Sequence, residues 1–377
     1  MRPVAQAEDV RFAERDWERV HRDWAAWWEG ELQRPLVVMH GFQWPAKPLP
    51  RVRLIAAKYP AEMTAGEIVD RIYPHLACMR YFGDAFPRWL PYFGPGILAG
   101  FLGANVNATD STVWFSLARE VELSDLKVAY DPDNAWWRRV REMTAAAVRK
   151  WGNEVVIGHT DLGGNLDVLA SLRTTECLLT DLHDAPEEVD RLVGEITMAW
   201  LRYYDETYDV VRKAGRGTNC WAPILSSQRC YMLQCDFSAM ISPSMFERFV
   251  MPDLEACCRA LDHGFYHLDG PGQIRHLDLL LSLKRLRGIQ WIPGDGAPPP
   301  EEWLPLLKRI RDGGKLCQLS VSADGAMKVV RELGGRGFVF EIMGFFDEET
   351  ARGFLAALHA ADRTVTPSQA LRASRHQ

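Results

Sequence analysis

The sequence predicts an α/β protein built as a (β/α)8 TIM barrel with an N-terminal helical, aromatic-rich extension. From residue 264 to residue 361, four short apolar runs alternate with four amphipathic segments, as in consecutive strand–helix units. Four earlier strand candidates bring the count to about eight, the number that such a barrel needs. A doubly wound open sheet is the weaker alternative, because no G-x-G-x-x-G turn follows the first strand candidate.

The extension, residues 1–35, reads as one amphipathic helix. Its apolar residues recur at three- and four-residue steps, with Arg, Glu and Asp between them. The stripe comprises Val10, Ala13, Trp17, Val20, Trp24 and Trp27. Such a stripe usually marks a core face, so we expect the helix to pack on the main domain. A dimerisation arm, and with it a homodimer, is the alternative.

The barrel is expected to span residues 36–362, beginning with a strand at 34–41. Residues 42–115 are rich in Pro, Gly and aromatic side chains and contain one expected helix, at about 65–82. A segment of this kind is usually a functional loop or cap rather than a spacer. Residues 363–377 read as a flexible tail.

The remaining elements follow in order along the chain. Strands are expected at 154–164, 218–224, 230–237, 264–269, 286–293, 315–321 and 337–344. Helices are expected at 165–172, 185–214, 242–261, 272–283, 299–313, 324–334 and 347–361. Ser242 followed by Pro243 is a typical helix start, since serine caps the first turn and proline suits its first position.

Composition restricts the classes of partner. The chain is 47% apolar and 25% charged with a net charge of −6, which is ordinary for a globular enzyme and argues against nucleic acid or an anionic membrane as partner. We find no uncharged apolar run of about 18 residues and no signal-peptide core, so a cytoplasmic protein without a membrane span is expected. The eight cysteines form no C-x-x-C pair, which predicts neither disulfides nor a cysteine-rich zinc site.

Polar side chains gather where the expected strands end, whereas the strand starts are apolar or glycine. Chemistry in a TIM barrel sits at the carboxyl ends of the strands, and buried polar groups there need a hydrogen-bond partner, a ligand or an ion. This asymmetry is the main evidence for a site. The residues are His159, Asp161, Asn165, Gln234, Asp236, His267, Asp269, Gln290, Gln318, Ser320 and Glu341.

His267, Asp269 and Glu341 form the candidate metal set. Glu341 lies in the apolar run "GFVFEIMGFF", where an unpaired charge would be costly. One imidazole and two carboxylates would leave positions open for water or substrate, as catalytic zinc and other divalent sites do. The alternative is that Glu341 pairs with Arg275 or Arg229 and that His267 only bonds a neighbouring backbone group.

The other candidates divide into catalytic and substrate-binding residues. Asp236 and Gln318 are the candidate catalytic or orienting groups. Ser226, Ser227 and Ser320 lack a nucleophile elbow, so serine hydrolysis is not expected. Loop tryptophans would suit an aromatic-walled pocket, although each alone is more typical of core packing. The candidate substrate-binding residues are His159, Asp161, Asn165, Trp221, Gln290 and Trp114.

Three segments resemble the uroporphyrinogen decarboxylase superfamily, which includes cobalamin-linked and zinc methyltransferases. They read "NLDVLASLRTTECLLTDLHDAPEEVDRLVGEIT", "CDFSAMISPSMFERFVMPDLEA" and "FYHLDG", and the resemblance runs from about 150 to 360. It implies the same barrel fold. The arginine-rich N-terminal signature of the porphyrinogen decarboxylases is missing, which argues against a porphyrinogen substrate.

The resemblance also implies roles for the metal set. The zinc methyltransferases hold their metal with a His-x-Cys pair and a cysteine on the last strand. His267 matches the histidine, while Asp269 and Glu341 stand where the two cysteines would lie. Paired replacement of thiolates by carboxylates is what a retained but harder metal site would look like.

The leading hypothesis is a metal-dependent methyltransferase or demethylase acting on a small methylated substrate. Zinc is the expected metal, and a corrinoid on a partner protein is the possible methyl carrier. A decarboxylase of a small organic acid is the second hypothesis, and its candidate cations are Arg173, Arg229 and Arg275. A non-catalytic binding barrel is the third.

Overall fold

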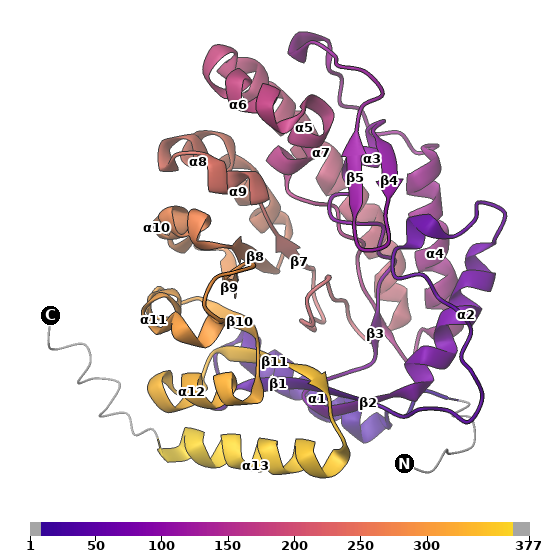
Figure 1. Ribbon diagram of the computed structural model, residues 1–377, viewed down its shortest axis with the longest axis vertical. Helices are drawn as coiled ribbons and strands as arrows, with labels where there is room; N and C mark the ends of the chain where they lie inside the picture. Colours follow the sequence, from indigo (N-terminus) through magenta and orange to yellow (C-terminus); the bar gives the residue numbers. More distant parts are fainter. Residues whose placement is uncertain (1–8, 365–377) are drawn as a thin grey trace, which may run out of the picture.

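A computed structural model describes residues 9–364 as a mixed α/β fold with a central, mostly parallel sheet (Figure 1). Most of the expected tail, residues 363–377, therefore lies outside the described part. No helix within it is both long and apolar enough to cross a membrane.

The main sheet has seven strands in the order β2-β1-β11-β10-β9-β8-β7, and all neighbours are parallel except β1 and β2. Its strands are β1 (Leu36–Phe42), β2 (Met79–Gly83), β7 (Cys230–Leu233), β8 (His263–Asp269), β9 (Leu286–Ile292), β10 (Leu316–Val321) and β11 (Phe338–Phe345). β3 (Arg88–Trp89) and β6 (Val156–Ile157) form a separate parallel pair, and β4 (Asn105–Ala108) and β5 (Val113–Ser116) an antiparallel one. Eight strands are thus parallel, but among the described residues no strand pairing closes them into a ring.

Helices follow the strands, and α8 to α13 succeed one another along the outside of the main sheet (Figure 1). The α-helices are α1 (Glu14–Trp28), α2 (Ala65–Cys78), α3 (Leu98–Phe101), α4 (Ala135–Trp151), α5 (Asn165–Arg173), α6 (Thr175–Asp184), α7 (Pro186–Val211), α8 (Pro243–Phe249), α9 (Met251–Ala260), α10 (Leu277–Ser282), α11 (Leu304–Asp312), α12 (Ala323–Leu333) and α13 (Glu348–Thr364). The 3-10 helices are η1 (Ala56–Lys58), η2 (Leu123–Asp125), η3 (Arg212–Ala214), η4 (Asp236–Met240), η5 (Pro271–His276) and η6 (Pro300–Glu302).

Strand residues alternate between two apolar clusters, which define two faces of the sheet. One cluster joins strand residues to α1, and we call this side the inner face; the other joins them to the surrounding helices, and we call it the outer face. Gly288 lies on the inner face, where a Cβ atom would stand 1.9 Å from the Phe265 ring. Inner-face residues of the apolar cluster are Leu36, Val38, Val156, Cys230, Met232, Phe265, Leu316 and Val339.

The predicted packing of the N-terminal helix on its own chain is confirmed. Trp17, Trp24, Trp27 and Trp28 are buried in the inner-face cluster. The Trp28 ring stacks on His263 at the start of β8, with 4.0 Å between ring centroids, and its indole N–H donates to the Leu225 carbonyl at 2.9 Å. The helix therefore fills the inner face at the amino ends of the strands.

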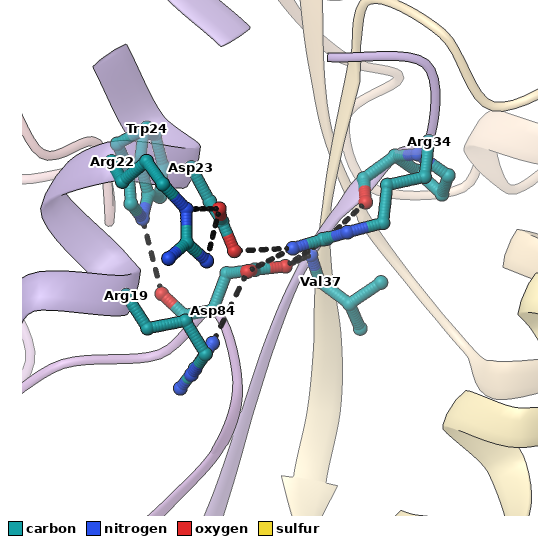
Figure 2. A network of polar contacts seen from close by, with 8 residues as sticks. Arg19, Arg22, Asp23, Trp24, Arg34, Val37 and Asp84 are labelled. Atoms are coloured by element: carbon teal, nitrogen blue, oxygen red, sulfur yellow. Dashed lines mark hydrogen bonds and ion pairs between the residues drawn. The ribbon is translucent and has the colours of Figure 1, made fainter. Parts of the chain in front are cut away.

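A buried ion-pair network fixes α1 to β1 (Figure 2). Asp84 accepts two hydrogen bonds from the Arg34 guanidinium, at 2.7 and 2.8 Å, and one from the Val37 N–H at 2.9 Å. Arg34 also donates to Asp23 on α1, and the Trp24 indole donates to the Asp84 carbonyl. Both ions keep several partners, which is the condition under which burying a charge pair is tolerated.

The segment at 218–224 is not a strand, contrary to expectation. Only one antiparallel bridge, between Thr218 and Ser226, forms there. Its strand-like pattern arises because Cys220, Ala222 and Ile224 pack into the inner-face cluster without pairing to a neighbouring strand. The eighth parallel strand is instead β3, which pairs with β6 and lies in the segment 42–115 that was expected to be a loop or cap.

Three further differences concern helices and edges. The helix expected at 242–261 starts at the predicted Ser242 cap but divides into α8 and α9 around Val250, because Pro252 has no N–H to continue the helical bonding. The helix expected at about 65–82 ends at Cys78, and β2 follows it. The sequence interpretation missed α4, whose Asn134 side chain caps the first turn.

Replacing Asp84 by alanine should leave the Arg34 guanidinium partly buried beside a single remaining carboxylate. We expect Asp84→Ala to lower the free energy of unfolding by about 3 to 5 kcal/mol, measured by urea denaturation. Asp70 pairs with Lys150 on the exposed surface, so Asp70→Ala, the matched control, should change it by less than about 1 kcal/mol. Equal losses in the two variants would contradict a special role for the network.

Candidate functional site

Three potential metal ligands meet at the carboxyl ends of β7 and β8. Asp236 opens η4 just after β7, and His267 and Asp269 end β8 on its inner face. One ligand atom from each residue lies within 4.8 Å of those from the other two, and His267 Nε2 is 3.9 Å from Asp269 Oδ2. Residues two apart on a strand share a face, which is why the His-x-Asp spacing places both side chains together.

A chain of buried amides orients the His267 ring. His267 Nδ1 lies 2.5 Å from Gln290 Oε1, and Gln290 Nε2 donates to Gln318 Oε1 at 2.6 Å. Since Gln290 gives its N–H to Gln318, it offers an oxygen to the imidazole, and Nδ1 must carry the proton. The network therefore assigns the tautomer that leaves a lone pair on Nε2, the atom that faces Asp269.

Trp221 covers the other side of His267. Its ring meets the imidazole edge to face, with 4.9 Å between centroids and 88° between planes. Its indole N–H is buried without an acceptor among the residues described. Trp221 thus lies beside His267, and its predicted role in substrate binding stays a prediction.

Two further carboxyl groups stand beside Asp236. Asp167 accepts hydrogen bonds from the backbone N–H groups of Asp236 and Phe237, at 3.0 and 2.7 Å, and so fixes the start of η4. Burial raises the pKa of Asp161 to about 7, and the nearby Asp236 charge adds to the rise. Loss of hydration also raises the pKa of Asp236, with Asp269 acting in the same direction and His267 against it. Negative charge is therefore crowded here, an arrangement that a cation would relieve.

Glu341 lies on the inner face of β11 but outside this group of three. Its carboxylate accepts a hydrogen bond from the Ser320 hydroxyl at 2.9 Å. Neither arginine considered as its partner contacts it: Arg275 donates to the Gly272 carbonyl, and Arg229 pairs with Asp205. Its role as the third ligand stays an expectation, and Asp236 is the carboxylate that the structure brings to His267.

Three predicted substrate-binding residues lie apart from the cluster. His159 stacks on Tyr204 of α7 with 4.5 Å between ring centroids, and burial lowers its pKa to about 3. Asn165 donates to Thr197 at 2.9 Å and to Asp253, both in the helix layer. Trp114 on β5 is 67% exposed. Gln290 and Gln318 are 2% and 0% exposed. They are therefore buried beneath His267, to which Gln290 bonds directly and Gln318 through Gln290.

Arg88 was missed by the sequence interpretation. It follows Phe86 of the inner-face cluster by two residues, and its guanidinium reaches the carbonyls of Cys220 and Trp221, the residue whose ring covers His267. The arginines proposed for a decarboxylase lie elsewhere; Arg173, for example, pairs with Asp181. The sequence did contain a clue to Arg88, because a lone charge lies there in the aromatic run "FPRWLPYF". The same kind of clue, a charge within an apolar run, had singled out Glu341.

The raised pKa of Asp161 predicts that stability falls as pH rises. Between about pH 4 and about pH 7 the folded chain keeps a proton that the unfolded chain has released, so rising pH favours unfolding. The free energy of unfolding should fall between about pH 4 and about pH 7, and we expect Asp161→Asn to make this fall smaller by roughly 2 to 4 kcal/mol. Urea denaturation at the two pH values, with chelator present, measures it. Asp133→Asn, at an exposed loop position, is the control. Equal pH dependence in both variants would contradict the assignment.

Comparisons with known proteins bear on the fold. No protein-family model matches the sequence, and a search of curated proteins finds no match. Among solved structures, a methyltransferase from Methanosarcina mazei matches with a TM-score of 0.58 at 13% identity, over 90% of this chain and 98% of that one. A dihydrodipicolinate synthase from Oceanobacillus iheyensis matches at 13% identity over 60% of this chain and 68% of its own, with a TM-score of 0.29. The chain shares the overall fold of the Methanosarcina methyltransferase.

Proposed function

We propose that this protein is a metal-dependent methyltransferase acting on a small methylated substrate at the inner face. The observation that carries the proposal is the His267 imidazole, held with its Nε2 lone pair beside two carboxylates. The shared fold with a methyltransferase supports the class of reaction. The resemblance to the uroporphyrinogen decarboxylase superfamily, which includes zinc methyltransferases, agrees with the proposed metal site and with the proposed class of reaction.

The donor set fits a divalent metal. His267 Nε2 and the carboxylates of Asp236 and Asp269 would hold it, and zinc accepts such nitrogen and oxygen ligands. Three protein ligands leave a position for a substrate atom. When bound, the metal would supply Lewis-acid activation of a substrate oxygen, nitrogen or thiol.

The chain's own residues would prepare this position. Gln290 and Gln318 hold the imidazole in one tautomer, and Trp221 covers one of its sides against water. Asp161, whose pKa is raised to about 7 by burial, can hold or release a proton near neutral pH beside Asp236. Asp161 follows β6, Gln290 and Gln318 lie within β9 and β10, and Trp221 lies in the loop before β7.

Decarboxylation of a small organic acid is the second candidate function. Arg88 favours it, because a guanidinium on the inner face would bind a carboxylate. The two functions differ in their need for metal. Release of carbon dioxide that persists in chelator would support the decarboxylase, and methyl transfer abolished by chelator would support the methyltransferase.

We expect the purified, untagged protein to bind about one zinc ion per chain, measured by plasma emission spectroscopy and by competition with a chromogenic chelator. His267→Ala and Asp236→Asn should each weaken binding by at least about tenfold, since each removes a ligand. Glu341→Gln should keep the affinity of the wild type, because Glu341 lies outside the ligand group. Loss of zinc in Glu341→Gln but not in Asp236→Asn would contradict this ligand set and restore Glu341.

Gln290→Met should lower zinc affinity by roughly tenfold to a hundredfold, because His267 loses the acceptor that fixes its tautomer. Gln290→Glu, which keeps an acceptor, should retain more of the affinity. Gln273→Met is the control, since Gln273 is also buried but has no contact with His267. If all three variants bind zinc equally well, the amide chain does not position the ligand.

A further inference from the structure

Arg88 has one side of its guanidinium fixed to the backbone. Nη1 donates to the Cys220 carbonyl at 3.2 Å and to the Trp221 carbonyl at 3.1 Å, and Nη2 donates to the Trp221 carbonyl at 3.2 Å. These three bonds hold the planar group in one orientation. The same backbone segment carries the Trp221 ring that covers His267, so Arg88 is fixed to the wall of the candidate site.

The opposite edge of the guanidinium is unused. A guanidinium carries five N–H donors, of which the backbone takes three. The Nε–H and the second Nη2–H, which point in parallel from the same edge, have no acceptor among residues 9–364. This pair is the fork that binds a carboxylate with two parallel hydrogen bonds.

No carboxylate of the described chain lies within ion-pair distance of Arg88. Arg34 shows the contrast, since the same kind of guanidinium is there paired with Asp84 and Asp23 (Figure 2). Arg173 is likewise paired with Asp181 at 2.7 Å. Arg88 is half-buried, and a charge partly withdrawn from water usually has such a partner.

Two titratable side chains lie near Arg88. Glu341 is the strongest charge acting on it, yet the two groups do not touch, and one oxygen of Glu341 is engaged by Ser320. Burial lowers the pKa of His40, the neighbouring inner-face residue of β1, to about 4, so His40 is neutral at physiological pH. No carboxylate of the described residues therefore occupies the Nε–H and Nη2–H edge, and Glu341 is the nearby charge with which an anionic ligand would compete.

We propose that Arg88 binds a carboxylate of the substrate through its Nε–H and Nη2–H edge. The proposal rests on the proposed function and narrows it to small methylated substrates that carry a carboxylate. The carboxylate would lie on Arg88 and the reacting end would point past Trp221 toward His267. A guanidinium fixed by the backbone selects a planar oxyanion without rearrangement, so it contributes to specificity.

Benzoate, acetate and their neutral amides test the subsite directly. We expect chelator-treated protein to bind benzoate or acetate at least about tenfold more tightly than benzamide or acetamide, measured by ligand-observed NMR titration. Arg88→Gln should abolish this preference, and Arg88→Lys should weaken carboxylate binding by about tenfold, because an ammonium keeps the charge but loses the fork. Equal binding of acids and amides by the wild type would overturn the proposal.

Two further variants control for charge and stability. Arg311 also donates to two backbone carbonyls but belongs to α11, so Arg311→Gln should leave carboxylate binding unchanged. Glu341→Gln removes a competing negative charge near Arg88 and should tighten carboxylate binding a few-fold. These variants, with Arg88→Lys, decide the question even if Arg88→Gln does not fold. Tightening in Arg311→Gln, or weakening in Glu341→Gln, would count against the subsite.

The chelator separates this proposal from the proposed function. Benzoate binding without metal reports on Arg88, whereas the zinc titration reports on His267, Asp236 and Asp269. A chain that binds benzoate but no zinc keeps the carboxylate subsite and refutes the metal-dependent function. Benzoate binding that occurs only in zinc-loaded protein would place the carboxylate on the metal and overturn the role of Arg88.

Discussion

The tryptophans of α1 fill the inner face at the amino ends of the strands, and the position of the site follows from that packing. Trp27 and Trp28 pack against Phe265, and the Arg34–Asp84 pair holds the helix in place. Apolar side chains of the strands complete this layer. His263, at the start of β8, is a polar residue within this layer and stacks on Trp28. The polar groups of the candidate site lie nearer the carboxyl ends, where η4 and the loop before β7 bring in Asp236 and Trp221.

Beyond the apolar layer, the buried polar side chains of the candidate site are hydrogen-bonded to one another, and a few of their atoms have no partner. Gln318, Gln290 and His267 form a continuous chain of hydrogen bonds that ends at Gln318 Nε2, which has no acceptor among the described residues. Among the buried side-chain atoms of the described residues that lack a partner, Gln318 Nε2 and the Trp221 indole N–H belong to this site. Buried polar atoms are rarely left without a partner in folded proteins, so water or a ligand is expected to complete these two atoms.

The sequence predicted the parts of this arrangement that depend on strand periodicity. His267 and Asp269 share a face because they are two residues apart on β8. The apolar stripe of α1 likewise predicted which side of that helix is buried. Contacts between distant loops leave no such period. Asp236 joins His267 because β7, which η4 follows, pairs with β8 in the sheet, and Arg88 reaches Trp221 across more than a hundred residues of chain. The segment at 218–224 was wrongly predicted to be a strand for the same reason. Its alternating apolar residues pack in the cluster that contains α1 and do not belong to a paired strand.

Opposite charges stand on the same inner face without neutralising one another. Asp236 and Asp269 gather beside His267, whereas Arg88 is held by the backbone carbonyls of Cys220 and Trp221. A guanidinium free to swing would pair with such carboxylates, because attraction between opposite charges strengthens away from bulk water. The three backbone bonds of Arg88 fix its guanidinium, so both an acidic and a basic group stay available. The separation has a chemical consequence: a metal ion at the acidic end and a substrate carboxylate at Arg88 would balance the inner face together, so each should favour the binding of the other.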